Sequence, residues 1–275
     1  MKRLFFILLS IFFVQAYAQD LNIIKGKSLL LSFNKANFKE ARLNDKSLIP
    51  LPHPTNKDKI LILITSPYKK PLKEANLRLV CSDKTLEFKI KGEQGTYPKE
   101  SLQVPKHKVS PPKEVQKRIQ DELKIANQVY ASFTKEMFLK SAFEMPLNSA
   151  ITSQYGSARV YNNGALASFH GGTDFRAPTG TPIKAANDGI VRLSMDRYYA
   201  GKSVIIDHGY KIFTQYYHLD KLLVKEGQRV KKGDIIALSG ASGRVTGAHL
   251  HFGIFANGTQ IDPLDFIAKF NALLK

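Results

Sequence analysis

Four histidines in the second half of the chain are spaced so that they could surround one point. His170 and Asp174 are four residues apart across a Gly-Gly pair, and glycine is flexible enough to let both side chains aim at one place. His249 and His251 are two residues apart, so on a strand both point to the same face. Imidazole and carboxylate groups brought together in this way suggest a metal site.

His218 is the remaining candidate, and it ends the run 211–217. Ile212, Thr214 and Tyr216 are expected to share its face of a strand. Two imidazoles and one carboxylate, with a fourth position open to water, are the ligand set of a catalytic zinc site. Zinc lowers the pKa of its bound water and polarises a carbonyl, which is the chemistry that amide hydrolysis requires. These residues therefore favour metal-assisted hydrolysis.

The other three histidines are interpreted as structural. A His-x-His pair arises by chance in roughly one chain in five of this length and histidine content, so a single motif decides little. A lone histidine on a strand is more often a hydrogen-bonded structural residue than a ligand. His53, His107 and His208 are assigned this role, and His208 is expected to shape a turn between strands.

The segment that carries these motifs has the texture of an antiparallel sheet. From residue 143 onward, short apolar runs alternate with glycines, and Gly227 and Gly233 are six residues apart. Tight turns need the positive φ that glycine adopts freely, so these positions are interpreted as hairpin corners. We expect one domain over residues 143–275, closed by a helix over 263–274.

Two segments precede this domain. Residues 19–92 contain apolar or alternating runs between Pro-rich turns and are predicted to form a small N-terminal β-domain. Residues 93–142 are predicted to be a Pro- and Lys-rich connector followed by an amphipathic helix, with Ser110 as N-cap and Pro111 at its first position. One face of that helix is expected to be apolar, at spacings of three and four: Val115, Ile119, Leu123, Ala126, Tyr130 and Phe133.

The composition indicates a basic, folded protein. With 41 Lys and Arg against 23 Asp and Glu, the 275 residues carry a formal charge of +18, and the 43% hydrophobic content excludes global disorder. The single cysteine, Cys81, excludes an internal disulfide framework. The positive charge indicates a polyanionic neighbour, such as nucleic acid, an anionic lipid surface or an anionic cell-wall polymer.

The start of the chain favours one compartment. A basic start at 1–3, an apolar run from Leu4 to Val14 and the small-x-small residues 16–18 form the pattern of a secretory signal peptide. Such a short run cannot span a bilayer as a helix. We expect residues 1–18 to be removed on export to the periplasm or cell wall, with no transmembrane segment in the mature protein and no nucleic acid as partner.

The order of the motifs resembles the M23 zinc metallopeptidases, also called lysostaphin-type or LytM. The matching stretches are His-x-x-x-Asp at 170–174, Tyr-Tyr-His-Leu at 216–219 and Ser-Gly-x-x-x-Gly-x-His-Leu-His-Phe at 242–252. The resemblance covers about residues 146–263. It implies a mainly β chain, in which a C-terminal antiparallel β-sheet peptidase domain follows the small β-domain and the connecting helix.

The resemblance also implies a role for each site residue. The zinc ligands would be His170, Asp174 and His251, binding one Zn²⁺ per chain, and the catalytic histidines that are not ligands would be His218 and His249. Ala248 stands where the family usually has proline, but alanine also adopts an extended backbone. Because all five site residues are present, the sequence differs from degenerate members that only activate other enzymes.

The implied function is hydrolysis of peptide bonds in peptidoglycan stem peptides or cross-links, in cell-wall remodelling and shape. The family contains D,D-endopeptidases, some of which are also D,D-carboxypeptidases, and Gly-Gly cutters, and the metal site does not separate them. Loops at about 157–167 and 196–202 are expected to decide which bond is cut.

Alternatives remain open. One is a catalytically silent wall-binding or amidase-activating protein of the same fold. Another is a lipoyl- or biotinyl-type carrier, which has a similar glycine pattern but needs a modifiable lysine at a hairpin tip that this sequence lacks. The N-terminal β-domain could act as an autoinhibitory cover over the groove or as a spacer or docking domain.

Overall fold

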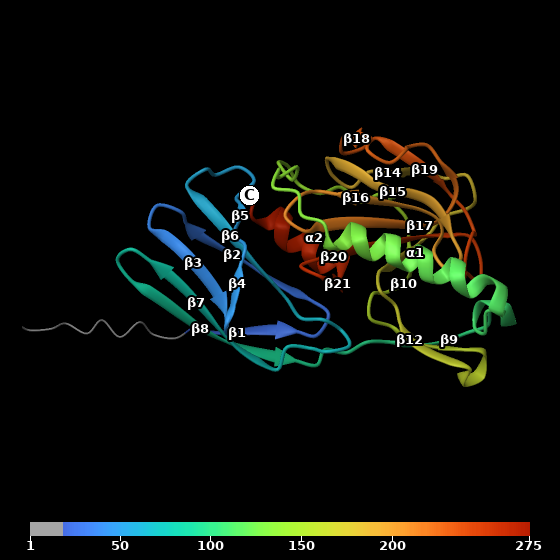
Figure 1. Cartoon of the computed structure of the whole chain (residues 1–275), viewed down its shortest axis with the longest axis horizontal. Helices are drawn as coiled ribbons and strands as arrows, with labels where there is room; N and C mark the ends of the chain where they lie inside the picture. Colours follow the sequence, from blue (N-terminus) through green and yellow to red (C-terminus); the bar gives the residue numbers. More distant parts are fainter. Residues whose placement is uncertain (1–18) are drawn as a thin grey trace, which may run out of the picture.

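The structure is a computed structural model that describes residues 19–275, so the predicted signal peptide 1–18 lies outside the described residues. β-Strands are the main regular structure of the described chain, which contains two α-helices, α1 (Lys113–Ala131) and α2 (Pro263–Ala272). The predicted mainly β fold class is therefore confirmed. Neither helix is both long and apolar enough to cross a membrane. Figure 1 shows an elongated molecule in which the first strands, in blue, lie at one end, and β15, β17 and β19 lie toward the other.

The N-terminal region, defined here as β1 to β8, contains two small sheets. One has the strand order β1-β8-β7-β3-β4, in which β1 and β8 run parallel, and the other has the order β2-β6-β5. Isoleucine and leucine side chains from both sheets form one apolar core. The strands are β1 (Gln19–Ile24), β2 (Ser28–Asn34), β3 (Phe38–Leu43), β4 (Lys46–Leu48), β5 (Leu51–Pro52), β6 (Lys59–Thr65), β7 (Glu74–Cys81) and β8 (Thr85–Glu93).

Strand β6 joins this region to the rest of the molecule. Its five central residues are all apolar, and because side chains alternate along a strand, such a run is buried on both faces. Ile60, Ile62 and Ile64 enter the core of the N-terminal region, whereas Leu61 and Leu63 belong to the main core of the C-terminal strands. The N-terminal region is therefore docked through apolar contacts.

The predicted connector and helix segment, residues 93–142, contains a β-strand and a 3₁₀ turn in addition to the helix. Strand β9 (Lys99–Leu102) pairs in parallel with β11 (Ala158–Tyr161), which also pairs with β12 (Leu166–Phe169). A 3₁₀ turn, η1 (Lys106–Lys108), then leads into α1. β9 and β12 are the outer strands of this small sheet, which Figure 1 places at the end of the molecule away from the N-terminal region.

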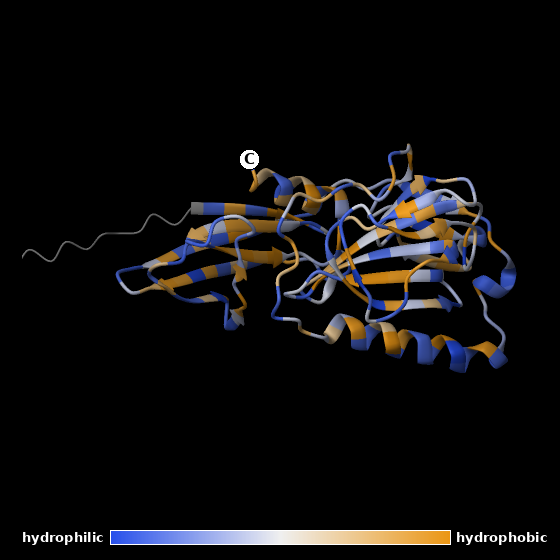
Figure 2. Ribbon diagram, turned by 90° about the horizontal axis from the view of Figure 1, so that it is seen from above, coloured by the Kyte–Doolittle hydropathy of each residue, from blue (hydrophilic) through white to orange (hydrophobic). Residues whose placement is uncertain are grey.

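Helix α1 differs from its predicted form in two details. It begins at Lys113, with Pro112 as its N-cap, two residues later than the sequence predicts. Leu123, expected on the packed face, is 59% exposed, while Glu122 is buried and accepts a hydrogen bond from the Tyr198 backbone N–H at 2.7 Å. A buried backbone donor needs a partner, and this explains a carboxylate at that position. Figure 2 shows the helix lying along one side of the C-terminal strands.

The C-terminal region, defined as β10 to α2, is built on one antiparallel sheet. Its main path is β10-β13-β20-β17-β16-β15-β18, to which β14, β19 and β21 add. The remaining bounds are β10 (Ile151–Ser153), η2 (Asn162–Gly164), β13 (Thr173–Arg176), β14 (Pro182–Lys184), β15 (Gly189–Arg197), β16 (Gly201–Asp207), β17 (Ile212–Leu222), β18 (Arg229–Val230), β19 (Ile235–Ser239), β20 (His249–Ala256) and β21 (Thr259–Ile261).

Helix α2 covers the core of this region on the side of β2. The Asp262 carboxylate caps it by accepting the backbone N–H groups of Leu264 and Asp265, and Pro263 occupies its first turn, as the sequence predicts. Phe266 and Phe270 are buried in the main core. The sheet thus rests on a rigid apolar base that holds its central strands in place.

Candidate metal centre

His170, Asp174 and His251 come together on two neighbouring strands. Asp174 on β13 and His251 on β20 are direct partners in the antiparallel register, and His170 lies in the loop that leads into β13. The His170 Nε2 and His251 Nδ1 atoms are each 2.9 Å from the Asp174 Oδ1 atom, and the two nitrogens are 2.9 Å from each other. All three side chains are buried.

The Gly-Gly pair before β13 allows this approach. A Cβ atom at position 172 would lie 2.4 Å from the Phe252 carbonyl oxygen and 2.7 Å from the His251 Nε2 atom. Any larger residue would push the His251 ring out of the cluster. Glycine is thus needed at position 172 for close contact, in addition to its flexibility.

Hydrogen bonding and charge prepare the three groups to act as ligands. Burial alone would raise the pKa of Asp174, but the hydrogen bonds and charges of His170 and His251 hold that pKa well below its usual range. Burial lowers the pKa of His251 to about 4, although Asp174 opposes this shift. The His170 Nδ1 atom is 2.9 Å from the Gln154 carbonyl oxygen, to which it donates, so its Nε2 lone pair is free.

The donor set fits a divalent metal ion. One ligand atom from each of these residues lies within 4.8 Å of the other two, a spacing at which one ion can reach all three. Neutral imidazoles and a carboxylate are ligands that zinc accepts, and three of them leave a position for water or substrate. The sequence-predicted ligand positions are therefore brought together.

His218 and His249 lie beside this cluster. Their ring centroids are 4.9 Å apart, and the His249 Nε2 atom is 3.7 Å from the Asp174 Oδ1 atom. The His218 Nδ1 atom is 2.9 Å from the Ser242 carbonyl oxygen, and the His249 Nδ1 atom is 2.8 Å from that of Gly247. Each Nδ1 is thus the donor, so in the neutral form of each ring the lone pair is on Nε2. Burial and the neighbouring histidines hold the pKa of His218 well below its usual range.

His218 reaches the site by a different route from the one expected. Tyr216, predicted to share its face, is buried in the main core, whereas the Tyr217 ring stacks on the His251 ring at 5.2 Å. His218 itself has a φ of +64°, and the pairing of β16 with β17 is irregular at this point. The bulge breaks the alternation of side chains, so Tyr217 and His218 both lie on the side of the metal cluster.

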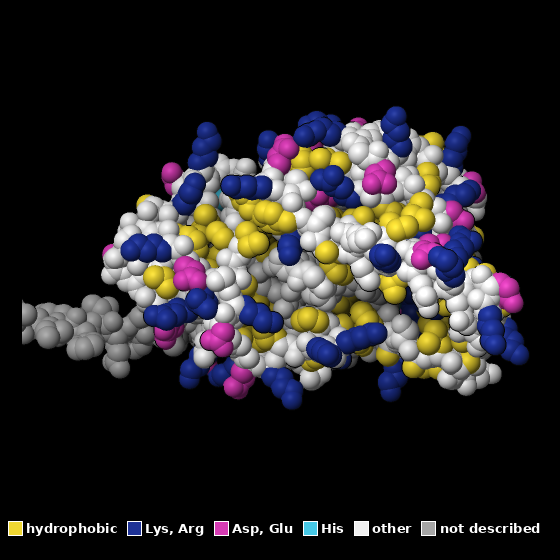
Figure 3. All heavy atoms as spheres, viewed as in Figure 1, with side chains coloured by type: hydrophobic (Ala, Val, Ile, Leu, Met, Phe, Trp, Pro, Cys, Tyr) yellow, Lys and Arg dark blue, Asp and Glu magenta, His cyan; other side chains and the backbone are white. Residues whose placement is uncertain are grey.

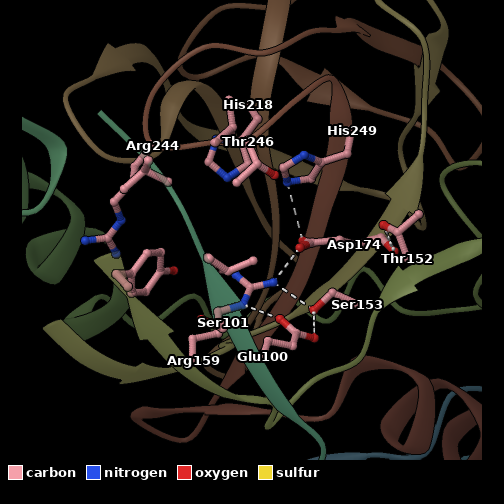
Figure 4. Close-up of a pocket in the computed structure, with 14 residues that line it drawn as sticks. Glu100, Ser101, Thr152, Ser153, Arg159, Asp174, His218, Arg244, Thr246 and His249 are labelled. Carbon is pink, nitrogen blue, oxygen red and sulfur yellow. Dashed lines mark hydrogen bonds and ion pairs between the residues drawn. The ribbon is translucent and has the colours of Figure 1, made fainter. Parts of the chain in front are cut away.

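A cavity of about 340 Å³ opens beside the cluster, and a second of about 210 Å³ adjoins it. Both predicted loops contribute to the walls, Arg159 and Tyr161 from the first and Tyr199 and Ala200 from the second. A third part of the cavity wall consists of residues from 100–104, which the sequence assigns to the connector and does not predict at the site. The lining residues shown in Figure 4 include none from the N-terminal region, so that region does not cover the groove in this structure.

Arg244 stands on the rim of both cavities. Its guanidinium carbon is 4.9 Å from the ring centroid of Tyr161 and 4.7 Å from that of Tyr199, so the cation is held between two aromatic rings. No carboxylate of residues 19–275 forms an ion pair with it. Its donors are therefore available to an anionic ligand in the groove.

The other three histidines lie away from the cluster. His208 is buried in the turn before β17, with its Nδ1 atom 2.6 Å from the Asp188 carbonyl oxygen and its Nε2 atom 2.8 Å from the Thr214 hydroxyl. The His53 Nδ1 atom accepts two backbone N–H groups in a turn. His107 lies in η1. All three therefore occupy positions consistent with the structural role assigned to them.

Comparison with known protein families places the cluster in a recognised domain. The family model described as peptidase family M23 matches residues 168–263. Over 129 residues the chain is 40% identical to the peptidoglycan DD-endopeptidase ShyA of Vibrio cholerae, which is 46% of this chain but 30% of that protein. Over 95 residues it is 37% identical to the DD-carboxypeptidase/endopeptidase Mpg of Neisseria meningitidis, 34% of this chain and 22% of Mpg. The chain therefore matches less than a third of the length of these relatives.

One crystal structure resembles nearly the whole chain. It is that of a Pseudomonas aeruginosa protein described as an M23 peptidase, with a TM-score of 0.68 and 24% sequence identity. The match covers 90% of this chain and 95% of the other. At this identity it establishes a shared fold, which extends beyond the matched domain into the strands before it.

Proposed function

We propose, from the peptidase family M23 domain that this chain carries, that the protein is a zinc-dependent peptidase that hydrolyses peptide bonds in peptidoglycan. The observation that carries the proposal is the cluster of His170, Asp174 and His251 beside an open groove that His218 and His249 also line. The names of the relatives support the substrate class.

In this proposal the three clustered side chains hold one Zn²⁺ per chain. Bound zinc lowers the pKa of a coordinated water and polarises the scissile carbonyl. His170 keeps its Nε2 lone pair for the ion because its Nδ1 donates to the Gln154 carbonyl oxygen. Asp174 contributes the single negative charge of the ligand set.

His218 and His249 handle the protons. In its neutral form each ring presents an Nε2 lone pair, because its Nδ1 donates to a backbone carbonyl. One of them takes a proton from the attacking water and passes it to the leaving amine. The half-buried His249 suits this transfer, since it reaches both the groove and the vicinity of Asp174. His218, which burial keeps neutral, orients water or substrate.

The substrate is proposed to be a D,D-peptide bond. ShyA is a peptidoglycan DD-endopeptidase and Mpg a DD-carboxypeptidase/endopeptidase, so we extend both activities to this chain, with a role in wall remodelling and shape. Removal of residues 1–18 takes away Lys2 and Arg3 and lowers the net charge from +18 to +16, which still favours adsorption to an anionic wall. Figure 3 shows Lys and Arg spread over the viewed face of both regions, which suits a surface that adsorbs broadly.

We also propose that the protein acts outside the cytoplasm, since its substrate lies there and residues 1–18 have the pattern of an export signal. The predicted division into domains, 19–92, 93–142 and 143–275, is retained as a proposal. The strand at Lys99–Leu102 associates the second segment closely with the third.

The test is digestion of purified peptidoglycan, with products identified by mass spectrometry. We expect cross-linked dimers to become monomers and pentapeptides to become tetrapeptides. A chelator should abolish both reactions and added zinc should restore them. A protein that binds wall and zinc but cuts nothing would instead be the silent binder. Conversion of pentapeptides without loss of dimers would restrict the activity to carboxypeptidase.

A further inference from the structure

Two of the three clustered side chains are held from behind by a polar network. The Asp174 Oδ2 atom, which faces away from the two histidines, accepts a hydrogen bond from Arg159 Nη2 at 2.7 Å. The same nitrogen donates to the Ser153 hydroxyl at 2.7 Å, and that hydroxyl is 3.0 Å from His170 Nδ1. Arg159 and Ser153 thus support two ligand positions at once.

Both supports end on one carboxylate, that of Glu100. Its Oε2 atom accepts from Arg159 Nε at 2.9 Å, and its Oε1 atom accepts from the Ser153 hydroxyl at 2.6 Å. Figure 4 shows Glu100, Arg159 and Ser153 joined by dashed lines below Asp174. Two oxygens of one rigid group therefore fix the positions of both supporting side chains.

The network also balances charge next to the cation site. The Glu100, Arg159 and Asp174 side chains are 21%, 14% and 6% exposed, so water screens their charges weakly. Glu100 neutralises the guanidinium, which leaves the charge of Asp174 for a metal ion. Without Glu100, Arg159 would keep only its ion pair with Asp174, so the guanidinium would compete with the metal ion for the charge of that carboxylate.

Glu100 reaches this place because of strand pairing. In the parallel pairing of β9 with β11, Glu100 is the direct partner of Arg159. Glu100, Ser153 and Arg159 all precede residues 168–263, which match the family model. The support for the cluster therefore comes from outside that matched segment.

We propose that Glu100 is a positioning residue of the metal centre, acting on Asp174 through Arg159 and on His170 through Ser153. Strand β9 is then a working part of the site. The proposal rests on the proposed function only in that a divalent metal binds at His170, Asp174 and His251. Groups that orient metal ligands are typically worth 10- to 100-fold in metal affinity.

The test measures zinc affinity of the purified protein by competition with a chromophoric chelator. Glu100→Gln, which keeps the shape and removes the charge, should bind zinc about 10-fold more weakly or worse. The thermal midpoint of the metal-free protein should shift by only a few degrees. Glu93→Gln, the same change at an exposed position of β8, is the matched control and should bind zinc as the unaltered protein does.

A double-variant cycle tests the route through Arg159. In an Arg159→Ala background, Glu100→Gln should weaken zinc binding by a smaller factor than in the unaltered protein, because the route through Arg159 is gone and only the route through Ser153 remains. Should Glu100→Gln reduce the yield of folded protein, Ser153→Ala tests the other arm by removing one hydroxyl, and weaker zinc binding is again expected.

Two results would overturn the inference: unchanged zinc affinity in both Glu100→Gln and Ser153→Ala, or independent, multiplying effects of Glu100→Gln and Arg159→Ala. A different result would refute the proposed function. If the unaltered protein bound no zinc, the metal centre itself would be wrong. The measurements on the unaltered protein and on the variants therefore separate the two failures.

Discussion

Two buried histidines lie toward opposite ends of strand β17. They are alike in burial but differ in the hydrogen bonds of their rings. His208, in the turn before the strand, is fully buried, and both of its ring nitrogens have partners, the Asp188 carbonyl and the Thr214 hydroxyl. His218, near the far end of the strand, has only its Nδ1 atom tied, to the Ser242 carbonyl. Its other nitrogen has no hydrogen-bond partner among residues 19–275 and lies beside the groove.

Burial and a lowered pKa are common to both sites, so neither property distinguishes them. Burial lowers the pKa of His208 to about 4 and holds that of His218 well below its usual range. What differs is the free acceptor nitrogen. A histidine whose two nitrogens are both bonded stabilises the fold, whereas one with a free nitrogen at a cavity is available for a metal ion or a proton.

The largest effect should come from His251→Ala, which removes a nitrogen from the metal cluster. We expect kcat/KM on peptidoglycan to fall by about 10³-fold or more, beyond the 10- to 100-fold that outer partners of metal ligands are worth. Circular dichroism should show that the variant is folded, and bound zinc should be lost. Retention of zinc and activity would contradict the assignment of His251 as a ligand.

Next in size is His218→Ala, which removes a free nitrogen but no proposed ligand. We expect kcat to fall by about 10²-fold, a typical contribution of a proton-transfer or orienting group. Zinc content measured by atomic absorption should remain at one per chain. Loss of zinc together with activity would mean that His218 is a metal ligand and not a proton-transfer or orienting residue.

His208→Gln tests the other end of the strand. We expect kcat within about twofold of the unaltered protein, but a loss of about 2 kcal/mol in the free energy of unfolding measured with urea at pH 7.5, because buried hydrogen bonds are lost. A large fall in the kcat of folded protein, with unchanged stability, would place His208 among the functional residues.

The unaltered protein and His208→Gln also test the lowered pKa of His208 through the pH dependence of stability. The pKa of His208 is about 4 when folded against an ordinary 6.5, so below pH 6.5 the unfolded chain binds a proton that the folded protein excludes. The contribution of buried, neutral His208 to the free energy of unfolding is therefore complete above pH 6.5 and is lost as the pH falls towards 4. The difference in the free energy of unfolding between the unaltered protein and His208→Gln, both measured at saturating zinc, should decrease as the pH falls over this range. A difference that is constant with pH would contradict the lowered pKa of His208.

The sequence predicts those features of the site that depend on neighbours in the chain. The spacing of His170 and Asp174 and of His249 and His251 is local, and among the apolar runs from which the sequence predicts a β-domain over 19–92, the one at 60–64 forms strand β6. Features that depend on tertiary pairing were missed. Glu100 lies 59 residues before Arg159, on a four-residue polar strand that resembles a linker.

Two further errors have the same origin. Nothing in the sequence around His218 signals its positive φ, so strict alternation put Tyr216 on the wrong face. Arg159 lies in the loop 157–167 that the sequence predicts to select the bond that is cut, yet its guanidinium is turned towards Asp174 and Glu100. The roles of these residues depend on which strands pair and in which register, and the local sequence pattern does not specify that pairing.

The smallest effect concerns the rim of the groove rather than the cluster. Peptidoglycan stem peptides carry carboxylates, and Arg244 offers unpaired donors between Tyr161 and Tyr199. We expect Arg244→Ala to raise KM for a soluble cross-linked stem peptide by about 10-fold, the size of one charge-assisted hydrogen bond, with kcat within about threefold.

The control must separate this contact from general attraction between a basic protein and an anionic substrate. Arg78→Ala removes the same charge from an exposed position of β7, outside the groove, and should leave KM nearly unchanged. Raised salt should reduce any long-range effect equally in both variants. If the two variants raised KM alike, Arg244 would contribute only net charge. If Arg244→Ala lowered kcat instead, the guanidinium would act on the transition state rather than on substrate binding alone, and Arg244 would belong with the reacting groups of the cluster.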